Sequence, residues 1–198
     1  MIAKLGCVLA LSLASAAPLL AAPFHHPYGE WREYHRDWLA SCPDAINEDA
    51  TSYYGYSCFA STSSQALNSA NLPAFQLTMI RNRLDGTLDL AVTVATDGAQ
   101  VDTSRPLVIQ FAGDAALRLD FAKDLETRHN TTNQFFVVDP AREATLLEHM
   151  KQRNALTMIV PLKSDSGQAS SQSVWLSMRG VLASLDFMAT YARKVKQY

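Results

Sequence analysis

Histidine and carboxylate side chains gather near the start of the chain and are the first candidates for chemistry. His25, His26 and His35 lie there with Glu30 and Asp37. Paired histidines can bind copper or zinc, and His35 beside either carboxylate can serve as the base of a small hydrolase. The spacing matches no helical zinc motif. We therefore expect no catalytic and no metal-binding residue, and we keep the hydrolase and the metal binder as alternatives.

Other catalytic motifs are missing from the sequence. No Gly-x-Ser-x-Gly elbow marks a nucleophilic serine, and the eight glycines are spread along the chain rather than gathered in a phosphate-binding loop. The formal charge of −2 is nearly balanced, which argues against nucleic acid as a partner. With 48% apolar residues the chain can bury a sizeable core. The sequence thus predicts a globular protein that is not an enzyme and uses no cofactor.

Residues 1–22 have the pattern of a secretory signal peptide. Lys4 gives a basic start, residues 5–13 form an apolar run, and small residues follow that run. The run is shorter than the ~20 apolar residues that span a bilayer. We therefore expect cleavage between Ala16 and Ala22, no transmembrane span in the mature chain, and a periplasmic or secreted protein.

Two cysteines remain after export, and they predict a disulfide. Cys7 lies inside the signal, which leaves Cys42 and Cys58 with fifteen residues between them. Disulfides persist in exported proteins, and closing a loop of this length contributes roughly 3 kcal/mol in the chain-entropy model. A two-thiolate metal site would need two more ligands, and no Cys-x-x-Cys motif or histidine pair flanks either cysteine. We expect a Cys42–Cys58 disulfide with Trp38 packed beside it.

The loop that this disulfide would close is rich in tyrosine. Tyr53, Tyr54 and Tyr56 surround Gly55 in a stretch of turn-forming residues. Most of the neighbouring aromatic side chains are expected to cover the disulfide and a sheet edge. We expect these three tyrosines to be exposed and to contact a partner protein.

Alternating side chains predict the strands, and cap residues predict a helix. Residues 75–80 and 87–94 alternate around an Asp85-Gly86 turn, which predicts an antiparallel hairpin. Asp139-Pro140 is typical of a helix start, because aspartate caps free amides and proline fits the first helical position. Further elements are expected as strands at 106–111, 116–121, 135–138, 156–162 and 174–178 and as a second helix after Gly180.

These elements predict one antiparallel, β-sandwich-like domain of the α+β or mainly β class, with two amphipathic helices, over residues 37–198. Residues 23–36 are expected to be a flexible lead-in with one helical turn around Glu30–His35. Irregular segments are expected at 43–57, 61–74 and 163–172.

Three short motifs stand in a fixed order along the chain. Asp37-Trp38 precedes Cys42 by a short spacer, Cys58 precedes a hairpin, and residues 174–180 (Val-Trp-Leu-Ser-Met-Arg-Gly) run into an Ala/Leu-rich helix. This order resembles the invasion-associated locus B family of exported bacterial proteins. It is also similar to a related group of uncharacterised periplasmic proteins.

Members of the invasion-associated locus B family usually carry a second cysteine pair, whereas residues 114–147 hold no cysteine here. The resemblance implies a β-rich protein of the Gram-negative envelope, linked in some members to host-cell invasion. It also implies no recognised active site. The signal, the single cysteine pair, the tyrosine loop and the lack of a catalytic motif together lead us to expect an envelope or host protein as partner.

Overall fold

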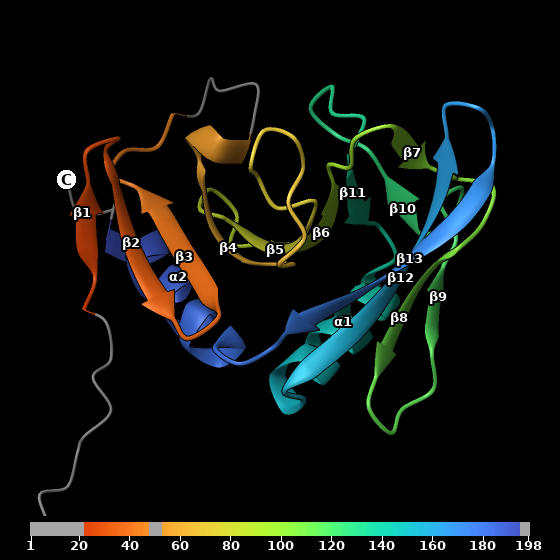
Figure 1. Cartoon of the computed structure of the whole chain (residues 1–198). Coiled ribbons are helices and arrows are strands. Elements are labelled where there is room, and N and C mark those ends of the chain that lie inside the picture. Colours follow the sequence, from red (N-terminus) through yellow and green to blue (C-terminus); the bar gives the residue numbers. More distant parts are fainter. Residues whose placement is uncertain (1–21, 48–52, 195–198) are drawn as a thin grey trace, which may run out of the picture.

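The computed structural model describes residues 22–47 and 53–194. The predicted signal peptide lies outside the described residues except for Ala22, so its cleavage stays a prediction. Two antiparallel sheets and two α-helices make up the described chain (Figure 1). Neither of these helices is long and apolar enough to cross a membrane.

The first sheet has eight strands in the order β1-β2-β3-β4-β5-β6-β11-β10. From β1 to β6 the spatial order follows the chain, so each strand pairs antiparallel with the strand before it. Its strands are β1 (Phe24–His26), β2 (Glu30–His35), β3 (Trp38–Pro43), β4 (Ser57–Ser63), β5 (Phe75–Asn82), β6 (Leu88–Val94), β10 (Leu125–Glu126) and β11 (Gln134–Val137).

The second sheet is smaller and is built around one long hairpin. Its order is β13-β12-β8-β9, and β7 pairs with the end of β12 that β8 leaves free. Its strands are β7 (Ala99–Val101), β8 (Leu107–Phe111), β9 (Leu117–Leu119), β12 (Ala155–Ser164) and β13 (Ala169–Ser177).

The helices cover the inner faces of the sheets. Helix α1 (Pro140–Gln152) begins after Asp139, whose side chain accepts hydrogen bonds from the amides of the first turn. Helix α2 (Val181–Lys194) lies across β2 to β5 (Figure 1). One core cluster joins both sheets and both helices, and it includes the fully buried Trp38, Leu146 and Met188. The predicted antiparallel, sandwich-like α+β fold is therefore confirmed.

The predicted hairpin and the two predicted helices are confirmed. Strands β5 and β6 pair along their length, with Asp85 and Gly86 in the turn between them. The strands expected at 106–111, 116–121, 135–138, 156–162 and 174–178 are also present, as β8, β9, β11, β12 and β13. The last of these begins earlier than predicted. It starts at Ala169, inside the expected 163–172 loop, because it pairs with β12 up to Lys163.

The first third of the chain differs from expectation. The helical turn predicted around Glu30–His35 is wrong, since these residues form β2 and pair with β3 from Glu30 to His35. The lead-in expected to be flexible contributes β1 and β2 to the edge of the first sheet. Strands β3 and β4 were not predicted, and β4 takes up residues assigned to the irregular segments at 43–57 and 61–74. A polar strand is stable here because its neighbours satisfy its backbone amides.

Candidate functional site

The predicted disulfide joins two neighbouring strands of the first sheet. Cys42 on β3 and Cys58 on β4 have their sulfurs 2.07 Å apart and their Cα atoms 4.2 Å apart. The register that pairs Ser41 with Phe59 places the two cysteines directly opposite each other one step further on. Both are buried in the main core. The bond thus closes the tyrosine loop at its base, where reductants have no access in the folded state.

Trp38 shares the buried face of β3 with Cys42 and links the two sheets. Its indole Nε1 donates to the backbone carbonyl of Ser177, at the end of β13, at 3.0 Å. The Ser177 hydroxyl in turn donates to the Asp37 carboxylate at 2.6 Å, and the Asp37 amide donates to the Arg179 carbonyl at 3.4 Å. The Asp37-Trp38 motif and the motif at residues 174–180 therefore meet in space, although about 140 residues separate them in the sequence.

Gly180 completes this junction by allowing very close approach. A Cβ atom there would lie 1.8 Å from the carbonyl oxygen of His35, and Gly180 has a φ of +116°. Only glycine accommodates both conditions. The turn between β2 and β3 is thereby packed directly onto the start of α2.

The tyrosines of the loop differ in exposure. Tyr54 is 56% exposed and meets Phe59 edge to face at 5.4 Å between ring centroids. Tyr56 is half-buried and packs against a small cluster of Ile80 and its neighbours on the outer face of the first sheet. Tyr53 opens the 3-10 turn Tyr53–Gly55, and its side chain lies outside the described residues. Tyr54 is therefore the more exposed of the two described tyrosine side chains, and contact of the loop with a partner stays a prediction.

Arg83 fixes both ends of the loop. It is buried, its Nη1 donates to the carbonyl of Pro43 at 2.5 Å, and its amide donates to the carbonyl of Tyr56 at 3.1 Å. Burial lowers the pKa of Arg83 from its usual range, while the nearby Asp44 carboxylate opposes that change. Arg83 and the disulfide together hold the base of the loop on the sheet.

The structure does not bring the N-terminal histidines together. His25 on β1 pairs with Trp31 on β2. His35 lies four residues beyond Trp31 on β2, which is about 13 Å from Trp31 at the usual rise of a strand. His25 Nε2 instead meets the Asp44 carboxylate at 2.5 Å. Within residues 22–47 and 53–194 no three histidine, cysteine or acidic side chains are close enough to hold a metal ion.

The proposed hydrolase pair is not assembled either. Glu30 accepts hydrogen bonds from Arg32 and Ser41, and Asp37 accepts one from Ser177. The carboxylate next to His35 is that of Glu33, at 3.7 Å. Burial lowers the pKa of His35, and this effect outweighs the attraction of Glu33 and Asp186. His35 is therefore neutral near pH 7 and packs edge to face on Phe187.

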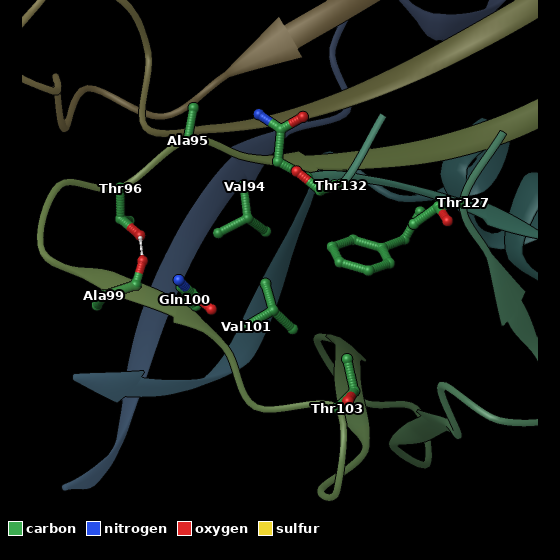
Figure 2. Close-up of a pocket in the computed structure, with 11 residues that line it drawn as sticks. Val94, Ala95, Thr96, Ala99, Gln100, Val101, Thr103, Thr127 and Thr132 are labelled. Carbon is green, nitrogen blue, oxygen red and sulfur yellow. Dashed lines mark hydrogen bonds between the residues drawn. The ribbon is translucent and has the colours of Figure 1, made fainter. Parts of the chain in front are cut away.

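A hollow of about 720 Å³ lies where the two sheets meet, near the ends of β6, β7 and β11. Figure 2 shows Val94 and Val101 pointing toward its centre from opposite sides, with Gln100 and Thr103 around them. The full lining is Val94, Ala95, Thr96, Ala99, Gln100, Val101, Thr103, Thr127, Thr132, Asn133 and Phe135. We call it the neutral groove, because none of these residues is charged.

Two smaller hollows share lining residues with the neutral groove. One of about 500 Å³ extends toward Lys163 and Asp165, and one of about 270 Å³ extends toward Phe121 and Leu125. Thr103 lines all three. Its side chain is exposed in the loop between β7 and β8. A ligand in any of the hollows would therefore lie close to Thr103.

The chemistry of the neutral groove is that of hydrogen bonding without proton transfer. Threonine hydroxyls and the amides of Gln100 and Asn133 can donate and accept, while Val94, Val101 and Phe135 supply apolar contact. The volume falls in the range of about 300–1,000 Å³ typical of ligand sites. The sequence alone does not reveal this site, because its residues come from separated segments and form no motif.

Comparison with known proteins gives a distant structural relationship. No family model and no curated protein matches the sequence. The fold is similar to that of invasion associated protein b from Bartonella henselae, with a TM-score of 0.50 and 14% identity. The match covers 80% of this chain and 96% of that chain. The chain is thus a distant structural relative of that protein, in agreement with the family that its motifs resemble.

Proposed function

We propose that this protein is exported to the bacterial envelope and acts there by binding a partner rather than by catalysis. The observation that carries the proposal is the neutral groove near the ends of β6, β7 and β11. General acid–base and nucleophilic catalysis need a titratable or activated side chain in the site. The described lining offers only hydroxyl, amide and apolar groups.

The lining also indicates the kind of partner. A charged group inside the neutral groove would lose hydration without an ionic partner among the lining residues, which is costly. The charged side chains of Asp102, Lys163 and Asp165 line the neighbouring hollow instead. An uncharged segment with amide and hydroxyl groups can exchange water for Gln100, Asn133 and the threonines. We infer that the groove takes an extended, uncharged stretch of an envelope or host protein.

Export is supported by the N-terminal pattern and by the buried disulfide. The structural similarity to an invasion associated protein from Bartonella agrees with an envelope role. Mass spectrometry of the protein isolated from its own cells tests this part. We expect a mature N-terminus between residues 17 and 23 and no free thiols. An intact Met1, with Cys7, Cys42 and Cys58 all present as reactive thiols in the soluble cell fraction, would contradict export.

Affinity capture from envelope extracts after crosslinking tests binding through the groove. Thr103→Trp places an indole where the three hollows meet, and it should remove a partner that the unmodified protein captures. Thr190→Trp, on an exposed position of α2, is the matched control and should leave capture unchanged. Equal capture by all three proteins would refute the groove as the binding site.

Tyr54 is a second candidate contact, because its ring is more than half exposed at the edge of the loop. Tyr54→Ala should weaken capture without changing the melting temperature by more than a few degrees. Unchanged capture would remove the tyrosine loop from the binding surface.

A further inference from the structure

Among the described residues, the terminal strands β1, β10 and β9 are protected against pairing with another strand. Strand β1 has three residues and lies between Pro23 and Pro27. Strand β10 has two residues and carries Glu126, and β9 has three residues and carries Arg118. Short length, proline and charge are the devices by which sheets avoid edge-to-edge association.

Strand β13 lacks all three devices. It has nine residues, Ala169–Ser177, and none of them is charged or proline. It is the terminal strand of the second sheet, so among the described strands only β12 pairs with it. Its side chains from Ala169 to Ser173 are exposed, and Trp175 is 62% exposed. An edge of this length and composition is a template for a further strand.

The register shows which backbone groups this edge presents. The Met178 amide bonds to Asn154, and the Ser164 amide bonds to Gln168, so even-numbered residues of β13 face β12. The amides and carbonyls of Ser171, Ser173 and Trp175 therefore point away from the sheet. At Ser177 the outward carbonyl already accepts the Trp38 indole. The open edge is thus residues 171–175.

We propose that this open edge binds the same edge of a second copy of the chain, giving an antiparallel β13–β13 pair across a two-fold axis at Ser173. Such a pair makes about six backbone hydrogen bonds. Its centre at Ser173 brings Trp175 of each copy opposite Ser171 of the other, so a large side chain faces a small one. Neither strand carries a charge that would repel the other.

A contact outside the strand favours a second copy over an unrelated strand. Arg105 donates to the Ser171 hydroxyl at 3.2 Å and is held by Asp102 at 2.7 Å. Arg105 also donates to the carbonyls of Leu162 and Ser170. Its guanidinium therefore lies over the β12–β13 pair beside Ser171, the residue that Trp175 of the second copy faces. A guanidinium beside an indole is a favourable pair. Ile159, paired with Ser173 and 38% exposed, adds apolar surface beside the axis.

Sedimentation equilibrium of the purified exported chain tests the proposal. The unmodified protein should be a dimer, and Ser173→Lys should raise its dissociation constant at least tenfold, because two lysines then face each other across the axis. Ala115→Lys adds the same charge in the exposed β8–β9 turn and should leave the dimer intact. A monomeric unmodified protein, or a dimer insensitive to Ser173→Lys, overturns the proposal.

A cysteine variant tests the register independently of any effect on folding. Ser173→Cys should form an intermolecular disulfide under mild oxidation, because paired residues across an antiparallel strand pair lie within disulfide reach. Ala115→Cys and the unmodified chain should give no covalent dimer. Absence of a covalent dimer from a folded Ser173→Cys variant, or equal yields from both variants, contradicts the β13 pairing.

Discussion

Replacing Gly180 by alanine tests whether the contact between the β2–β3 turn and the start of α2 holds the two sheets together. The new Cβ would lie 1.8 Å from the carbonyl oxygen and 2.9 Å from the carbonyl carbon of His35. These are backbone atoms, so the turn must move rather than a side chain. The substitution also places a side chain at a φ of +116°, which costs about 1–3 kcal/mol.

Moving the turn also breaks hydrogen bonds that cross the junction. These are the bonds from the Trp38 indole to Ser177, from Ser177 to Asp37, and from the Asp37 amide to Arg179. At about 1 kcal/mol net for each bond, and with the strain at Gly180 added, we expect a total loss of about 4–6 kcal/mol. For a chain of this size that lowers the melting temperature by about 8–24 °C.

Gly113→Ala separates the clash from the backbone strain. Gly113 also has a positive φ, +84°, but a Cβ there would meet no atom within 4 Å. It should therefore cost only about 1 kcal/mol. Equilibrium urea unfolding of both variants, followed by tryptophan fluorescence, gives the two free energies. A Gly180→Ala variant no less stable than Gly113→Ala would refute the role of the junction.

Three further predictions follow from the buried groups. Replacing both Cys42 and Cys58 by alanine should lower the free energy of unfolding by roughly 3 kcal/mol, and thiol labelling of the unmodified exported chain should stay negative until it is both unfolded and reduced. Burial lowers the pKa of folded His35 below its usual 6.5. The stability that neutral His35 contributes to the folded state is therefore complete above about pH 6.5 and is lost as pH falls through the folded pKa. His35→Gln should flatten that part of a plot of unfolding free energy against pH, and an unchanged slope would contradict the burial argument. Tyr56→Ala should cost about 2–4 kcal/mol, because it exposes the cluster on the outer face of the first sheet, whereas Tyr54→Ala should cost less than 1 kcal/mol, and equal losses in thermal melts would refute this distinction.

Sequence periodicity predicts the strands whose buried positions are large and apolar. In β8 the buried residues are Leu107, Ile109 and Phe111, and this alternation is plain in the sequence. In β4 the buried residues under α2 include Cys58, Ala60 and Thr62. Such small or polar side chains let the helix approach closely but give no periodic signal. Strand β4 can therefore be recognised only once its pairing with β3 and β5 is known.

The Cys42–Cys58 pairing was predictable because the predicted signal peptide contains Cys7, and its removal would leave two cysteines. The neutral groove was not, because its position depends on which strand ends meet. Val94 closes β6, Val101 belongs to the other sheet, and Thr132 precedes β11. Their proximity follows from how distant segments of the chain pair and pack. The local sequence pattern of each segment does not predict that arrangement. The same holds for the meeting of Asp37 with Ser177.

Photo-crosslinking in the cells that make this protein tests partner binding through the groove most directly. A photoreactive side chain at Thr103, where the three hollows meet, should give an adduct of one defined mass with an envelope or host protein. The same group at Thr190 should give none. Adducts of the same kind from both positions, or none from position 103 in a folded, exported protein, would contradict binding through the groove.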